Sequence, residues 1–234
     1  MKLLSIFKKK SAGRNDGLIE RYKSMRKTGL SLNMALVKQV PKPAVPECGK
    51  KLGIYKAGTL ILSNEDEIAV LYDYCLHHYR RADKNVIQRY AEQSPPESGS
   101  DEALLLEALL SARYSLFRVE AVLPRQGVTL HDLLFGERLD LTDISLSDTA
   151  EPGLILAGRL LRLPEFIMSS GTLIPVSEPA YQAHLLPVIR KYQPDPEAPP
   201  KLSPSQAASF EAQIIRIALR EGGEDPVFYT DVEH

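Results

Sequence analysis

Tryptophan is absent from this 234-residue chain, and aromatic residues make up only 7% of it. That scarcity disfavours a large aromatic platform on which bases could stack. Two cysteines, Cys48 and Cys75, are too few for a disulfide scaffold and are typical of a reducing compartment. No apolar run approaches the roughly 20 residues that span a bilayer, and the apolar run in "MKLLSIFKKK" is too short for a signal peptide. We therefore expect a cytoplasmic protein.

The common catalytic signatures are also missing. The chain has no G-x-S-x-G, H-E-x-x-H, G-x-x-x-x-G-K-[ST] or G-x-G-x-x-G sequence. His131 and Asp132 are neighbours on an expected strand, so their side chains should point to opposite faces. An acidic group within the β-rich segment could hold Mg²⁺, but acids are also ordinary turn formers. The members of this group are Asp140, Asp143, Asp148 and Glu151. We predict no catalytic residues, no cofactor and no metal, and a hydrolase with an unrecognised site stays open as a second alternative.

Charge is present in quantity and is unevenly distributed. Residues 1–51 contain thirteen lysines and arginines against three acids, a net charge of +10, so the remaining 183 residues carry −11. Such asymmetry can mark a surface for nucleic acid, anionic lipid or an acidic partner. It can equally mean that the basic region lies against the acidic remainder of the same molecule or of a second copy. Both interpretations remain open at this point.

The stretch "DYCLHHYRR", residues 73–81, is the one that most resembles a chemical site. Cys75 and His78 could supply two metal ligands from one helix, but a structural zinc site needs about two more. Apolar residues recur at helical spacing from Ile68 to Tyr90 and predict a single stripe over about six turns, on which Cys75 lies. A buried cysteine acts as a small hydrophobe. We therefore interpret this stretch as helix core.

The pattern predicts an α+β fold with a small barrel. N-terminal helices, with a break near Gly29, lead through the proline-rich residues 41–46 to a hairpin at Ala57 and Gly58. Alternating polarity over residues 114–178 predicts five or six short antiparallel strands, SH3-like or OB-like in order. Helix caps are expected at Ser63 and Ser100, and "SDTAEPG", residues 147–153, predicts a loop within the barrel segment. C-terminal helices follow, kinked at Pro187 and capped at Ser203. The segments divide as 1–45, a basic helical arm; 46–113, helices with a hairpin; 114–178, the barrel; and 179–234, helices with a proline-rich connector and an acidic tail.

One resemblance covers about residues 50–176. The sequences "DLLFGERLDL" and "PGLILAGRLL", with the helical segment before them, resemble uncharacterised bacterial proteins. Some members of that group end in a SecA-like zinc-binding tail. The tail of this chain, "FYTDVEH", contains no cysteine and cannot form that zinc site. The resemblance implies the layout of helices and small barrel, and it supplies no catalytic residues.

These features favour a non-catalytic interaction or regulatory protein that binds another protein or itself. The alternative is a nucleic-acid-binding protein that uses the basic N-terminal region, where binding would weaken steeply with salt. The residues expected to contact an anionic partner are Lys8, Lys9, Lys10, Arg14, Arg26 and Lys27. A weaker membrane-surface variant would insert the apolar residues 3–7.

Overall fold

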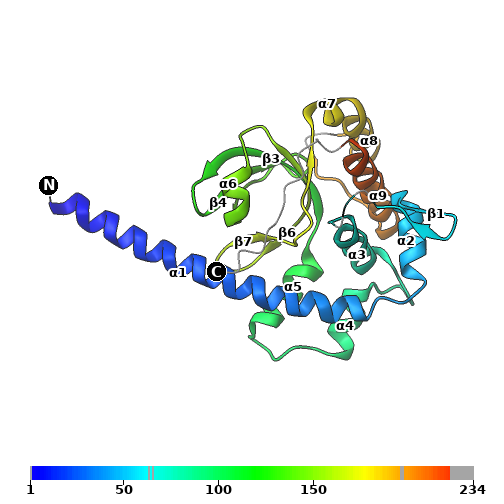
Figure 1. The fold of residues 1–234 in the computed structure, drawn as a ribbon, viewed down its shortest axis with the longest axis horizontal. Coiled ribbons are helices and arrows are strands. Elements are labelled where there is room, and N and C mark those ends of the chain that lie inside the picture. The colour runs from blue at the N-terminus through cyan, green and yellow to red at the C-terminus, as the bar shows by residue number, and fades with distance from the viewer. Residues whose placement is uncertain (1, 63, 65, 196–197, 222–234) are drawn as a thin grey trace.

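The computed structural model describes residues 2–62, 64, 66–195 and 198–221, with the side chains of the first helix described from Gly17 onward. Helices precede and follow a small barrel, so the predicted α+β architecture is confirmed (Figure 1). The helices before the barrel are α1 (Lys2–Lys38), α2 (Ala44–Leu52), α3 (Asp66–His78), α4 (Val86–Gln93) and α5 (Asp101–Ser111). Those after it are α7 (Glu178–Ala180), a π-helical turn (Tyr181–Leu185), α8 (Leu186–Tyr192) and α9 (Pro204–Glu221).

Six strands form the barrel sheet, in the order β3-β4-β5-β7-β6-β8. Their bounds are β3 (Tyr114–Leu123), β4 (Gly127–Asp132), β5 (Arg138–Thr142), β6 (Ile155–Arg162), β7 (Ile167–Ser169) and β8 (Ile174–Val176). An additional pairing of β3 with β6 closes five strands into a ring and leaves β8 as an extra strand on β6. The expectation of a wholly antiparallel barrel is wrong, because β5 and β7 pair in parallel.

The alternation of side chains along the strands separates the barrel interior from two further cores outside it, one against α2, α3 and α9 and one against α1, α4 and α5. Phe117, Val119, Leu139 and Leu141 point into the barrel, as the alternating pattern predicts. Residues on the outer faces of β3 and β6, such as Leu116 and Ala157, pack instead against α2, α3 and α9. Both faces of the early part of β3 are therefore buried, so that even the polar Ser115 is only 1% exposed.

Helix α1 is continuous through Gly29, so the expected break there is wrong. A Cβ atom at Gly29 would lie 3.8 Å from the Met168 side chain and 4.0 Å from that of Leu105. These are ordinary van der Waals distances, so Gly29 lies at the contact of α1 with α5 and the barrel without being required there by space. Burial of Met25, Leu32 and similar residues against α5 offsets the lower helix propensity of glycine.

Helix α2 lies inside a segment that its prolines led us to expect as irregular. Pro46 is the third residue of this helix. A missing backbone N–H costs no helical hydrogen bond there, because the carbonyl four residues earlier lies before the start of the helix. The predicted hairpin after α2 is confirmed as β1 (Tyr55–Lys56) and β2 (Thr59–Leu60). Its turn residues Ala57 and Gly58 both have positive φ, as a two-residue hairpin turn requires.

The predicted six-turn helix from Ile68 to Tyr90 is instead two helices, α3 and α4. Helix α3 ends at His78, and Ala82 and Asp83 in the turn that follows adopt left-handed φ values of 47° and 62°, which a continuous helix cannot contain. Asn85 then starts α4 with a capping box to Gln88. The local hydrogen bonds of this turn override the apolar periodicity. Ile68, expected on the buried stripe, is 42% exposed.

Two smaller differences concern the loop after β5 and the C-terminal helices. Residues 147–149, expected as part of a loop, belong to α6 (Ile144–Thr149), which Asp143 caps. Directly before Pro187, which cannot donate a helical hydrogen bond, the helix widens into the π-helical turn. The predicted cap of α9 at Ser203 is confirmed by hydrogen bonds in both directions with Gln206. The expected cap at Ser63 and the acidic tail lie outside the described residues.

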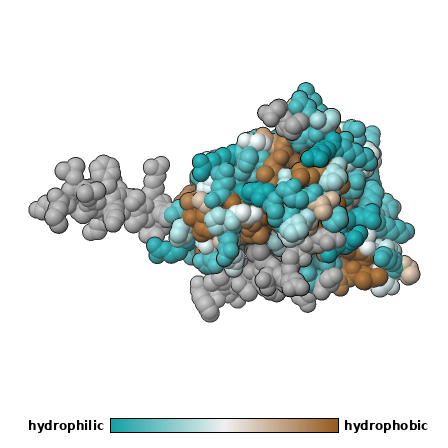
Figure 2. Space-filling view, turned by 90° about the horizontal axis from the view of Figure 1, so that it is seen from above, coloured by the Kyte–Doolittle hydropathy of each residue, from teal (hydrophilic) through white to brown (hydrophobic). Residues whose placement is uncertain are grey.

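Figure 2 shows the side of the molecule away from α4 and α5. Hydrophobic residues occur there as separate patches between hydrophilic ones.

Candidate functional site

A buried ion network joins the helices to the barrel. Arg159 lies on β6, on the same strand face as Ile155 and Ala157, and so faces away from the barrel interior. Asp73 comes from the middle of α3, and Glu211 comes from α9. All three side chains are less than 10% exposed. Three segments that are distant in sequence thus place their charges at one buried point.

Arg159 is the centre of this network. Its Nε donates to Asp73 Oδ2 at 3.0 Å, and its Nη2 donates to Glu211 Oε1. The other Glu211 oxygen lies 2.6 Å from His78 Nε2. The Arg159 guanidinium also lies 5.3 Å from the ring centroid of Tyr114. One guanidinium therefore ties α3 and α9 to the sheet through charge-assisted hydrogen bonds.

Burial and the opposite charges act against each other on the pKa values of the network. Burial raises the pKa of Asp73, although Arg159 opposes this effect. Burial alone would also raise the pKa of Glu211, but Arg159 and His78 together hold that pKa below its usual value. The pKa of Arg159 is raised, because Glu211 and Asp73 outweigh the effect of burial. At neutral pH the arginine and Glu211 therefore remain charged.

His77 stands beside this network without a hydrogen bond to its Nε2. Its side chain is 7% exposed, and Nε2 lies 4.0 Å from Asp73 Oδ1. Burial lowers the pKa of His77 well below 6.5, and the positive Arg159 lowers it further. The imidazole is therefore neutral in the folded protein.

The part of the stretch "DYCLHHYRR" that lies in α3, residues 73–78, is thus helix core, as predicted, and it also supplies Asp73 and His78 to the network, whereas residues 79–81 lie beyond the helix. Cys75 is fully buried, and its thiol interacts with that of Cys48 and with the Ala44 carbonyl oxygen at 3.7 Å. Burial and the hydrogen bond to Cys48 raise the pKa of Cys75. Within the described residues, no group of three or more histidine, cysteine or acidic side chains is placed to hold a metal ion.

The predicted anion-binding residues fall into three groups. The side chains of Lys8, Lys9, Lys10 and Arg14 lie outside the described part of α1. Arg26 is half-buried, and its Nη1 donates to the Ser169 carbonyl oxygen at 3.3 Å, so it serves the packing of α1 on the barrel. Lys27 is exposed.

The acidic residues considered for Mg²⁺ have separate structural roles. Asp143 accepts the Leu146 N–H at the start of α6, and Asp140 accepts the Thr129 hydroxyl at 2.7 Å. Asp148 and Glu151 are exposed. Asp132 Oδ1 accepts the Ser115 hydroxyl and the N–H groups of Leu134 and Phe135, and so fixes the turn after β4.

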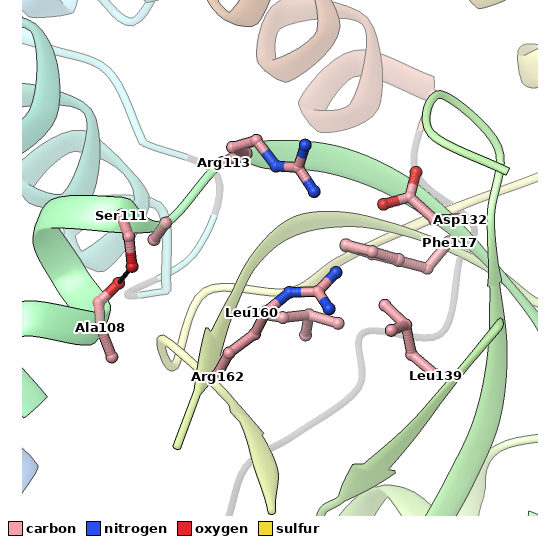
Figure 3. A pocket seen from close by; sticks show the side chains of 9 residues that line it. Ala108, Ser111, Arg113, Phe117, Asp132, Leu139, Leu160 and Arg162 are labelled. Atoms are coloured by element: carbon pink, nitrogen blue, oxygen red, sulfur yellow. Dashed lines mark hydrogen bonds between the residues drawn. The ribbon is translucent and has the colours of Figure 1, made fainter. Parts of the chain in front are cut away.

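A small hollow at the end of the barrel contains Asp132, with Arg113 and Arg162 on opposite sides (Figure 3). Its volume is about 30 Å³, which is room for one water molecule. Both arginines pair with Glu137, the Arg113 contact being 3.3 Å. Both arginines at this hollow therefore already have an ion-pair partner within the protein, which they share.

A larger groove opens between α2, α3 and α9, directly outside the ion network. Its volume is about 670 Å³. Lys51, Arg80 and Arg216 line it, and His78 forms part of its floor. Sequence reasoning missed both the groove and the network. The one available signal was Arg159 itself, a single charge within the apolar run "LILAGRLL".

The fold and the site define an α+β protein in which helices enclose a closed five-stranded barrel and are joined to it by buried charges. A family model matches residues 16–194, and the chain belongs to that family, described as "Family of unknown function (DUF7986)". The expected membership of an uncharacterised family is thereby confirmed. The bacterial source of the chain and its relation to proteins with a zinc-binding tail stay predictions. Comparison with curated proteins and with solved structures gave no match. No helix among the described residues is long and apolar enough to cross a membrane.

Proposed function

We propose that the chain is a non-catalytic interaction protein that associates with a second copy of itself through the outer surface of α1 and α5. The observation that carries this proposal is the position of the exposed apolar side chains. Leu30 and Met34 on α1 are 52% and 63% exposed, and Leu110 on α5 is 46% exposed. Exposed residues of this size that gather on adjoining elements are typical of interaction surfaces.

These exposed residues lie on parts of α1 and α5 that are close to each other. Near one end of the contact between the two helices, Arg21 of α1 pairs with Asp101 of α5. Farther along both helices, Gly29 of α1 lies opposite Leu105 of α5. Contacts therefore advance in the same direction along α1 and α5. The residues that follow, Met34 on one helix and Leu110 on the other, lie toward the same end of the pair.

Opposite charges accompany the apolar side chains. Lys27 on α1 and Glu107 on α5 are both exposed, and neither makes an ion pair with another described residue. A two-fold axis through such a surface would bring Lys27 of one copy toward Glu107 of the other, since a patch of this kind is complementary to itself. The division of the chain into a basic first part and an acidic remainder supports the same pairing.

Sedimentation velocity over a range of protein concentrations tests this proposal. The full chain should associate reversibly, and Met34→Glu or Leu110→Glu should raise the dissociation constant at least about tenfold, because each places a charge in the apolar contact. Ile61→Glu is the matched control, since Ile61 on the β1–β2 hairpin is 57% exposed. It should leave association unchanged.

A chain that remains monomeric at every concentration would contradict the proposal. The nucleic-acid alternative has its own readout, the fluorescence anisotropy of a labelled oligonucleotide. If a monomeric chain bound the oligonucleotide, and Lys27→Glu removed that binding, the basic surface of α1 would belong to a nucleic-acid contact instead.

A further inference from the structure

The groove between α2, α3 and α9 carries positive charge that the protein does not neutralise. Lys51, Arg80 and Arg216 line it, against the single carboxylate of Asp83. Lys51 and Arg216 are exposed and make no ion pair with any residue that the structure describes. Elsewhere in the molecule, Arg113 and Arg162 share Glu137, and Arg159 has two carboxylates. The groove is thus a hollow with unpaired cations.

Arg216 has a defined position at the rim of this groove. Gly53 ends α2 with a left-handed φ of 79°. A Cβ atom at Gly53 would lie 3.3 Å from Arg216 Nε and 3.8 Å from Arg216 Cγ, so the arginine side chain lies directly over the end of α2. A cation is favourable there, because the carboxyl end of a helix carries partial negative charge. The glycine therefore makes room for the arginine.

The beginning of α9 adds hydrogen-bond donors to the same groove. Ser203 and Ser205 line it, while the hydroxyl of the neighbouring Ser209 already donates to the Ser205 carbonyl oxygen at 3.0 Å. The positive end of the dipole of this 18-residue helix lies beside the cations. The Gln206 N–H is already bonded to Ser203 Oγ and Pro204 has no N–H, so the contacts left for phosphate oxygens are the hydroxyl groups and the cationic side chains.

The floor of the groove is fixed before any ligand arrives. The Tyr74 hydroxyl donates to the Ala208 carbonyl oxygen at 2.9 Å, which ties α3 to α9. His78 is held by Glu211 at 2.6 Å, and Glu211 is held in turn by Arg159. The ion network therefore links the two helical walls of the groove. A preformed site of this kind loses little conformational entropy on binding.

We propose that this groove binds a small molecule that carries a phosphate or diphosphate ester. Its volume of about 670 Å³ lies within the range of small-molecule sites. Lys51, Arg80 and Arg216 contact the phosphate oxygens, and the side chains of Pro204 and Ala208 on α9 provide apolar surface for the rest of the ligand. This site is independent of the α1–α5 surface.

Calorimetric titration of the full chain with inorganic pyrophosphate tests the proposal. We expect saturable binding at one site, weaker at high salt. Lys51→Gln and Arg216→Gln should each weaken it about tenfold, through the loss of one charge-assisted hydrogen bond. Lys50→Gln is the matched control, because Lys50 neighbours Lys51 on α2 but lies 5.9 Å from the ring centroid of Tyr55 and does not line the groove.

Citrate, an anion of comparable charge, separates phosphate recognition from simple charge attraction. Under the proposal, citrate binds less tightly than pyrophosphate, and Lys50→Gln binds pyrophosphate like the unmodified chain. Absence of saturable binding at low salt would overturn the proposal. So would equal weakening by Lys50→Gln and Lys51→Gln, or tighter binding of citrate. Near-ultraviolet circular dichroism of each variant confirms that it is folded.

Discussion

Two groups of charged residues in this protein have opposite surroundings. Arg159, Asp73 and Glu211 are buried and fully paired with one another. Lys51 and Arg216 at the groove, and Lys27 on α1, are exposed and have no ion-pair partner among the described residues. Burying a charge costs several kcal/mol unless it is paired, so the first group serves the architecture. The second group costs the fold little and is available to a ligand or a second chain.

The strongest test of this contrast is Arg159→Met. Replacing Arg159 leaves Asp73 buried without its ion-pair partner and Glu211 with His78 alone, which should cost about 3–5 kcal/mol in the free energy of unfolding. The matched control is Arg162→Met on the same strand, since Arg162 is 48% exposed and pairs with Glu137 at the surface. That change should cost less than about 1 kcal/mol. Urea denaturation measures both, and equal losses would contradict the structural role of the buried group.

Acid should destabilise the protein through His77. Its pKa in the folded chain lies well below 6.5, so the unfolded chain binds the proton first, and stability falls as the pH decreases through 6.5 toward the folded pKa. The loss due to this residue therefore grows as the pH is lowered from 6.5 to 5. His77→Gln should remove that component from urea denaturation measured over this range. His184→Gln, at an exposed position, should leave it in place.

Cys75→Ala tests whether the buried core can be weakened without an effect on the groove. Cys75 lies in that core, on the same helix as the groove residue His78. The change should lower the free energy of unfolding on the order of 1 kcal/mol, as expected for a small buried side chain. Pyrophosphate binding should be unchanged. Stoichiometric zinc that disappears in this variant, measured by metal analysis, would instead show that Cys75 and His78 are ligands.

Much of the fold could be predicted because its signals are local. The caps at Ser100 and Ser203, the hairpin at Ala57 and Gly58, and the inward side chains of the barrel strands all depend on neighbours within a few residues. The continuation of α1 through Gly29 and the end of α3 before Ala82 depend on contacts with other elements or on turn conformation. Apolar periodicity alone does not contain that information.

The candidate site was less predictable. The stretch around Cys75 was correctly assigned to the core, but Asp73 and His78 acquire their roles only from Arg159 and Glu211, which are far away in sequence. No pattern along the chain pairs those positions. The groove likewise combines the end of α2, the end of α3 and the start of α9. Such sites become visible only when tertiary packing brings the segments together.

Replacing the exposed charges of the α1–α5 surface should have the smallest effect on the free energy of unfolding, while it should change self-association directly. Lys27→Glu and Glu107→Lys should each change the free energy of unfolding by less than about 0.5 kcal/mol, because both side chains lie at the surface. Each should weaken self-association by placing like charges opposite each other across the two-fold axis.

The most direct measurement is therefore sedimentation equilibrium of Lys27→Glu, Glu107→Lys and the double variant that carries both changes. The proposed two-fold contact predicts weaker association in each single variant and recovery in the double variant, in which the opposite charges face each other again. Association that is unaffected by the single changes, or that is not restored by combining them, would contradict the contact between α1 and α5 of two copies.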